Sequence, residues 1–210
     1  MERDKIADSG CEMKINNRLE GKVLKILLSI NAFMFIAEIT LGILSESTAL
    51  IADSLDMLAD ATVYSIALYA VGRSPVVKIK AAHISGVFQV LLGVLVSADV
   101  IRRLIYGSEP ESFLMIAVGM VALIANVICL MLISKYKEGE VHMRASWIFS
   151  KNDVIANLGI IISGGFVYLL DSRFPDLIIG IIISIIVIRG GIHIIKDAHQ
   201  EKCLHLENCT

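Results

Sequence analysis

Three aspartates inside one hydrophobic stretch of helix length constrain the fold of this chain more than any other feature. Asp53, Asp56 and Asp60 lie in the mainly apolar segment 48–72, and spacings of three and four residues place them on one face of a helix. An aspartate at the centre of a membrane helix opposes insertion by about 2.5–3.5 kcal/mol. Three of them nearly cancel the favourable transfer of the surrounding apolar residues, so this face needs a cation or another helix as its partner.

The composition indicates that the segment belongs to a membrane protein. Hydrophobic residues make up 56% of the 210 residues and the mean hydropathy is +0.73, which is too apolar for a soluble domain of this length. We predict an all-α integral membrane protein with six transmembrane helices, at about residues 23–45, 48–72, 82–106, 113–134, 145–170 and 176–195. A soluble bundle of six helices that are apolar on nearly every side is the weaker alternative.

The distribution of lysine and arginine predicts the orientation. With a cytoplasmic N-terminus, the outer segments hold only Arg102, Arg103 and Arg173, whereas the inner segments hold most of the lysines and arginines. Both termini are therefore predicted to be cytoplasmic. The predicted organisation is a polar N-terminal segment at 1–21, a six-helix membrane domain at 22–195 and a short tail at 196–210, and neither terminal segment can form its own core.

Polar residues predict which of the six helices line the interior of the bundle and which lie at its periphery. The first predicted helix carries Asn31 and Glu38 on one face, and the fifth carries Ser150, Asp153 and Asn157 on one face, with Asn152 to its side. We expect these two helices and the aspartate-bearing helix to form the polar interior. The third and sixth helices are expected at the periphery or at a subunit interface.

These residues resemble the cation diffusion facilitators, six-span transporters that move divalent metals, commonly out of the cytoplasm in exchange for protons. The resemblance covers about residues 22–195, and its most specific part is the segment Ser47-Thr-Ala-Leu-Ile-Ala-Asp-Ser-Leu-Asp-Met-Leu-Ala-Asp60. It implies that Asp56 and Asp60 hold the metal, and that the segment from Arg144 to Asn157 supplies further ligands. It also implies a homodimer and a transporter without enzymatic activity. No basic stripe with interleaved aromatic residues predicts a nucleic-acid partner.

The chain departs from the family pattern at three places. Phe149 stands where the family usually has a His or Asp, four residues before the aspartate of the fifth helix. The histidine- and glycine-rich loop between the second and third helices is replaced by the segment 77–86. The cytoplasmic C-terminal domain of many members is expected to be absent, as in the known short members of the family.

Chemistry gives the same expectation for the site. Asp56, Asp60 and Asp153 can face one cation between the second and fifth helices, with Asn157, Ser150, Asn152 or water completing the ligands. An oxygen set of this kind suits Zn²⁺ and also Mn²⁺, Fe²⁺ or Co²⁺, and it disfavours softer Cd²⁺ without excluding it. Weaker candidate ligands are Asp53, near the outer end of its helix, and the helix-linking pair Glu38 and Asn31.

Close carboxylates also allow coupling to protons. An empty site would hold a proton that the metal displaces, which gives antiport if only the loaded and the protonated forms change access. The prediction is a zinc-exporting proton antiporter in a bacterial inner membrane, with no resident cofactor. The alternatives are a transport-inactive membrane scaffold or modulator of the same fold, and a proton- or sodium-coupled transporter of an organic solute.

Several other residues are interpreted as structural. Asp99 is expected to pair locally with Arg102 and Arg103, and His83 and His142 are expected to be solvated at loop edges. The four cysteines form no disulfide framework, although the tail from His199 to Cys209 could hold a soft metal. One further expectation concerns assembly: a face of small residues on the third helix is predicted to form a dimer contact within the membrane, at Ala82, Gly86, Gly93 and Ser97.

Overall fold

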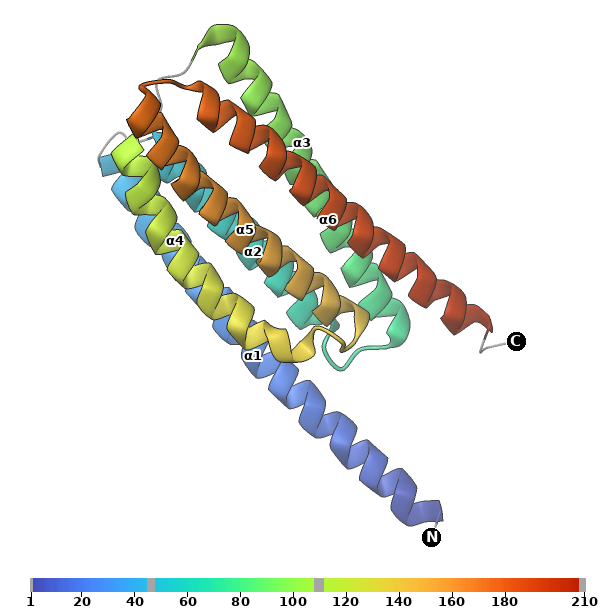
Figure 1. The fold of residues 1–210 in the computed structure, drawn as a ribbon. Helices are drawn as coiled ribbons and strands as arrows, with labels where there is room; N and C mark the ends of the chain where they lie inside the picture. Colours follow the sequence, from blue (N-terminus) through green and yellow to red (C-terminus); the bar gives the residue numbers. More distant parts are fainter. Residues whose placement is uncertain (1, 45–47, 108–111, 208–210) are drawn as a thin grey trace.

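The computed structural model describes the backbone of residues 2–44, 48–107 and 112–207, and the side chains of 16–40, 54, 56–107, 112–113 and 115–205. Six helices and a short 3₁₀ turn account for nearly all of this part of the chain, and it contains no strand (Figure 1). The elements are α1 Glu2–Leu44, α2 Thr48–Ala70, α3 Pro75–Tyr106, α4 Ser112–Ile133, η1 Ser134–Tyr136, α5 Val141–Leu170 and α6 Phe174–Glu207. The prediction of an all-α protein with six long helices is confirmed.

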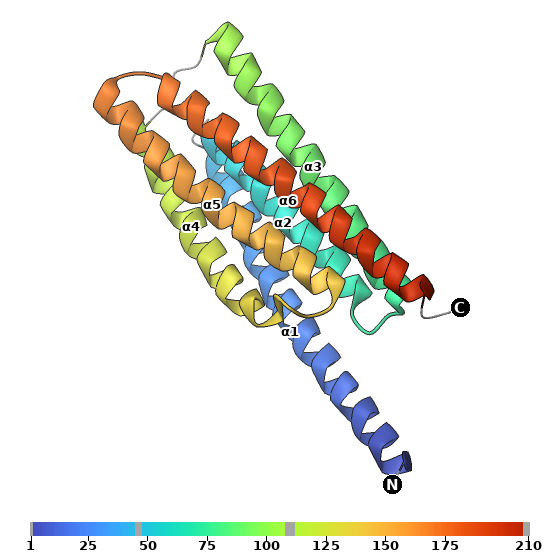
Figure 2. The same cartoon turned by 45° about the vertical axis from the view of Figure 1, so that its right-hand side comes forward.

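Five of the described helices are long and apolar enough to cross a membrane, namely α1, α3, α4, α5 and α6. The remaining helix, α2, contains the three aspartates, and other helices surround it. It packs against α1, α3, α4 and α5, so most of its surface faces other helices (Figure 2). The chain is a multi-pass integral membrane protein.

Two helices run well beyond the predicted spans. Helix α1 begins at Glu2, about twenty residues before the expected start of the span, and α6 continues to Glu207. Hydropathy identifies only the apolar centre of such helices, whereas their polar ends continue in helical form because Glu, Lys and Arg favour helices in water. Side-chain pairs one turn apart support these ends, as where Asn16 Nδ2 donates to Glu20 Oε1 at 3.1 Å.

Both termini lie at the same end of the helix bundle. Figure 1 shows the connections α2–α3 and α4–α5 at this end too, while α5 and α6 are joined at the opposite end. An even number of crossings places the two termini on one side, as the predicted cytoplasmic location of both ends requires. We call this the terminal end of the bundle.

The small-residue face of α3 is covered by α6 of the same chain. Gly86 lies against Ile195 and the backbone of Gly191, and Gly93 lies against Ile188. A β-carbon at Gly93 would come within 2.6 Å of Ile188 Cγ1, so the helices approach as closely as glycine allows. The prediction that this face forms a dimer contact is therefore wrong, because its small residues already serve a contact within the chain.

The local ion pairs of α3 are confirmed. Arg102 Nη2 and Arg103 Nε each lie 2.6 Å from a carboxylate oxygen of Asp99. Arg103 also reaches Asp176 at the start of α6, at 3.4 Å. An ion pair thus joins α3 to α6 where α3 ends and α6 begins, and glycine contacts join the two helices along their length. The polar interior lies among α1, α2, α4 and α5.

Candidate metal site

Two buried carboxylates from different helices approach each other inside the bundle. Asp60 of α2 is fully buried and Asp153 of α5 is 6% exposed. Asp56, one turn before Asp60, is half-buried, and the three carboxylates lie within electrostatic range of one another. Helical spacing alone placed Asp56 and Asp60 on one face, and the packing of α2 against α5 brings the third carboxylate to them.

The carboxylate oxygens at this point lack hydrogen-bond donors. Neither oxygen of Asp60 has a hydrogen-bond partner among the described residues, and neither has Oδ2 of Asp153. Leaving a carboxylate buried without a donor or a counter-charge costs several kcal/mol, so buried acids are normally paired or bind a cation. The carboxylates of Asp60 and Asp153 therefore have oxygens available as ligands, and a positive charge between them would stabilise them.

The three carboxylates are near one another but do not form a closed cage. When one carboxylate oxygen is taken from each of Asp56, Asp60 and Asp153, the three oxygens do not all lie within 4.8 Å of one another. A different group of side chains in the described part of the chain does meet that distance. A bound dication would have to draw these oxygens closer together. The arrangement is an open set of oxygens around a polar interior.

Two further predicted ligands lie on the same stretch of α5. Asn157 is 1% exposed, one turn beyond Asp153, and its amide nitrogen has no hydrogen-bond partner in the described part of the chain. Ser150 is equally buried, and its hydroxyl lies beside the phenol of Tyr64 on α2. Phe149 is also buried, so this family ligand position is filled by an aromatic ring inside the bundle and not by a lipid-facing side chain.

The remaining candidates are held elsewhere or lie outside the described side chains. Asn152 packs against Gly190 of α6, away from α2. Asn31 donates to the backbone of Leu27 and to Cys129 Sγ, 3.0 and 3.5 Å away, which ties α1 to α4. Glu38 is buried in α1, whereas the side chain of Asp53 lies outside the described residues.

Two neighbours of the carboxylates were not predicted to belong to the site. Tyr64, one turn after Asp60, and Cys129 of α4 are fully buried, and both lie within electrostatic range of Asp60. Tyr64 could have been found from the periodicity of α2, because it continues the face of the aspartates. Nothing in the spacing of α4 points to Cys129, whose position follows from helix packing.

A second cluster was missed as well, and it concerns His142. This residue was expected to be solvated, yet it is 1% exposed, so that prediction is wrong. By contrast, His83 is exposed as expected. A position near a loop does not determine whether a side chain is buried. The different exposure of His83 and His142 therefore became visible only from the packing of a distant segment of α1.

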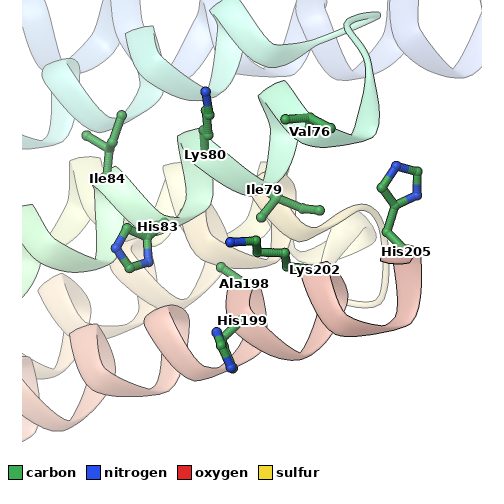
Figure 3. Close-up of a pocket in the computed structure, with 9 residues that line it drawn as sticks. All are labelled: Val76, Ile79, Lys80, His83, Ile84, Ala198, His199, Lys202 and His205. Atoms are coloured by element: carbon green, nitrogen blue, oxygen red, sulfur yellow. The ribbon is translucent and has the colours of Figure 1, made fainter. Parts of the chain in front are cut away.

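A cavity of about 450 Å³ lies between α3 and α6 near the terminal end. Three histidines line it, but Figure 3 shows that His83, His199 and His205 point in different directions and do not converge. On the same part of α6, Cys203 Sγ lies 3.9 Å from His199 Nε2, so the predicted soft-donor tail is helical here and brings one thiol near one imidazole. No third donor joins them among the described residues.

Buried, unpartnered acids between the helices of a membrane bundle are typical of proteins that carry cations. Residues 24–201 match the cation efflux transmembrane domain, which covers most of the chain. The chain belongs to the cation efflux family.

Curated relatives include the zinc transporter ZitB of Escherichia coli, which is 26% identical over 82% of this chain and 59% of its own length. The vacuolar zinc transporter ZRC1 of Saccharomyces cerevisiae is 35% identical over 59% of this chain and 32% of its own length. The cadmium, cobalt and zinc/H(+)-K(+) antiporter of Bacillus velezensis is 24% identical over 87% of this chain and 64% of its length. The chain thus spans less than two-thirds of the length of these relatives.

Proposed function

We propose that this protein exports divalent metal cations from the cytoplasm through a site between α2 and α5. The observation that carries the proposal is the facing pair Asp60 and Asp153, which are buried on two different helices with oxygens that lack donors. Membership of the cation efflux family and the names of the relatives, which are transporters of zinc or of cadmium, cobalt and zinc, support it.

The proposed ligands are Asp56, Asp60, Asp153 and Asn157. Their oxygens favour borderline and hard dications, so Zn²⁺ leads, and Co²⁺, Fe²⁺ and Mn²⁺ follow. Cd²⁺ is also included among the proposed cargo ions, because the thiol of Cys129 lies near Asp60. The metal is cargo, and the proposal includes no resident cofactor and no chemical conversion of a substrate.

We further propose that export is coupled to protons. Asp60 and Asp153 cannot both remain charged in a medium of low dielectric unless a cation joins them. A proton shared between them serves that purpose when the site is empty, and the metal displaces it on binding. Metal is then exchanged for protons across the membrane, provided that the site opens to the other side of the membrane only when it holds a metal ion or a proton.

The test is metal uptake into proteoliposomes that contain a metal-sensitive dye, with an imposed pH gradient. Asp60→Asn keeps the size of the side chain but removes its charge, and should reduce uptake to the level of empty vesicles. Asp171→Asn is the matched control, because Asp171 is exposed at the end of α5 and the same change should leave uptake intact. Uptake at the wild-type rate by Asp60→Asn would exclude Asp60 as a ligand.

Proton release separates this function from a transport-inactive scaffold. Zn²⁺ added to purified protein in weak buffer should release more protons from the wild type and from Asp171→Asn than from Asp60→Asn/Asp153→Asn. A scaffold, for which the buried Phe149 in a ligand position is the argument, would release the same amount from all three proteins. An organic-solute transporter would also show no difference between them, because its central acids would not bind Zn²⁺.

A further inference from the structure

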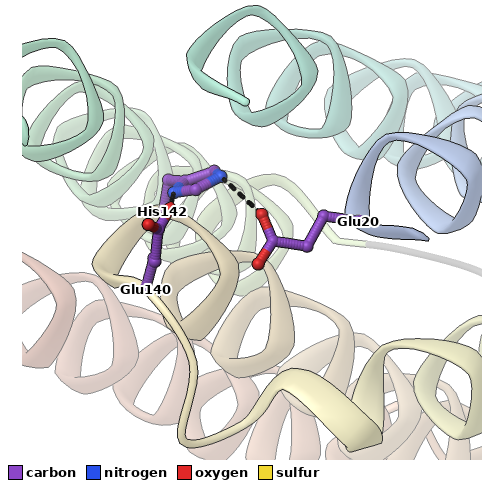
Figure 4. A group of neighbouring side chains, drawn as sticks. All are labelled: Glu20, Glu140 and His142. Carbon is purple, nitrogen blue, oxygen red and sulfur yellow. Dashed lines mark ion pairs between the residues drawn. The ribbon is translucent and has the colours of Figure 1, made fainter. Parts of the chain in front are cut away.

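A second group of ligand-type side chains lies at the terminal end of the bundle. Glu20 belongs to α1, Glu140 is the residue before α5, and His142 lies in the first turn of α5 (Figure 4). One ligand atom from each of the three lies within 4.8 Å of the others. In the described part of the chain this is the one group of three or more His, Cys, Asp or Glu side chains that meets so closely.

The imidazole sits between the two carboxylates. His142 Nε2 is 3.9 Å from Glu20 Oε2, and His142 Nδ1 is 3.7 Å from Glu140 Oε2. Figure 4 shows one acid near each ring nitrogen, with Glu140 coming from the start of α5 and Glu20 from α1. These separations exceed hydrogen-bond length, and a cation that binds a ring nitrogen and a carboxylate oxygen would lie about 2.0–2.2 Å from each of these atoms.

Burial makes the unpartnered atoms of this cluster significant. Glu20 and His142 are both 1% exposed, and neither ring nitrogen of His142 has a hydrogen-bond partner among the residues that the structure describes. Glu20 Oε2 also has none, whereas Glu20 Oε1 accepts from Asn16 and is thereby held in place. A buried imidazole normally donates from at least one nitrogen, so its bare nitrogens beside a bare carboxylate oxygen indicate a missing ligand.

The charge of the cluster favours a cation. Glu20 and Glu140 contribute two negative charges, and Lys78 of α3, paired with Glu140, contributes one positive charge. With His142 neutral and both glutamates ionised, the cluster carries one net negative charge in a mostly buried setting. Lys78 lies within electrostatic range of Glu20 and His142 as well, but its ion pair among the described residues is with Glu140.

We propose that Glu20, Glu140 and His142 form a binding site for a borderline divalent cation such as Zn²⁺ or Co²⁺. One imidazole nitrogen and two carboxylate oxygens make a three-ligand set that leaves a fourth position open to water, which suits a site that exchanges its ion. The imidazole disfavours Mg²⁺ and Ca²⁺, which prefer oxygen ligands alone.

This site is separate from the one between α2 and α5. His142 and Asp153 are both in α5, eleven residues apart, which corresponds to about 16 Å along the helix. The cluster lies at the end where both termini and the α4–α5 connection are found (Figure 1). There it would hold a cation at the inner mouth before transfer to the central carboxylates, a role that rests on the proposed function.

The test is Co²⁺ binding to the purified full-length protein in detergent, measured by equilibrium dialysis and by the visible absorption of the bound ion. In the Asp60→Asn/Asp153→Asn background, which lacks the central acids, we expect one Co²⁺ per chain. Adding His142→Gln should weaken this binding by about 100-fold or more, because loss of even an outer-shell partner of a metal ligand costs about 10–100-fold. Glu20→Gln, which keeps the size of the side chain, should act in the same direction.

The matched control is His193→Gln, which removes an exposed imidazole of α6 and should leave binding unchanged. If His142→Gln and Glu20→Gln both bind Co²⁺ as tightly as their background, the inference is wrong. Failure of the central site gives a different result, because Asp60→Asn/Asp153→Asn would then bind as many ions as the wild type while His142→Gln still lost one.

Discussion

The close contact between α3 and α6 predicts that one added methyl group will destabilise the bundle. Gly191 of α6 faces Gly86 and Val90 of α3. A β-carbon at Gly191 would lie 2.8 Å from Gly86 O, 2.8 Å from Val90 N and 2.7 Å from Val90 Cγ2. Two of these three atoms belong to the backbone and cannot rotate away, so Gly191→Ala forces the two helices apart.

The size of the effect follows from two opposing contributions. Overpacking a filled interior costs about 1–3 kcal/mol, and contacts with backbone place this case in the upper part, at about 2–3 kcal/mol. Alanine improves helix propensity over glycine by about 0.5–1 kcal/mol. The net loss of stability is about 1–2 kcal/mol, which lowers the melting temperature of a chain of this length by about 2–8 °C.

Thermal unfolding of the detergent-solubilised protein measures this, with loss of the monodisperse peak in size-exclusion chromatography as the readout. Gly165→Ala in α5 is the matched control, because nothing lies within 4 Å of a β-carbon there. It should melt at or above the wild-type temperature. If Gly191→Ala melts together with Gly165→Ala, the α3–α6 contact described above does not exist in the protein.

Two further substitutions test the site and its framework. Phe149→His, one turn before Asp153, should raise uptake of Zn²⁺ relative to Mn²⁺ in vesicles by adding an imidazole, and an unchanged ratio would show that this position does not reach the metal. Arg144→Lys should destabilise the protein by about 1–2 kcal/mol, because lysine cannot keep the two-pronged contact with Asp197 at 2.8 and 3.1 Å. Arg102→Lys, on a more exposed pair within α3, should change thermal stability little, and equal effects of the two changes would contradict this reading.

The fold was predictable because hydropathy reports directly on the bilayer. Apolar runs located all six helices, and Pro75 and Pro175 stand in the first turns of α3 and α6. The helix ends at Glu2 and Glu207 were not predictable in this way, since polar residues are compatible with helix and with loop alike. Hydropathy also could not show that the small-residue face of α3 packs against α6 of the same chain, because this depends on tertiary contacts.

Prediction of the site succeeded where neighbours lie on one helix and failed where they meet across helices. The burial of Asp60 follows from its place in an apolar run, and that of Asp153 from its place among serines and asparagines of α5. The burial of His142 depends on Glu20, which is 122 positions away in sequence and comes from the polar extension of α1. No periodicity links two such positions, so the cluster appears only once α1 is packed beside α5.

The partners of the acidic residues separate structural roles from cation binding more clearly than their spacing does. Asp99 contacts arginines of its own helix, α3, and Asp197 of α6 contacts Arg144 of α5, which neutralises both acids. Asp60 and Asp153 have no cationic partner among the described residues, although they are more deeply buried. Burial without a counter-charge is the costlier arrangement, and a chain that retains it at two facing positions gains most in stability when a mobile cation or proton occupies the gap.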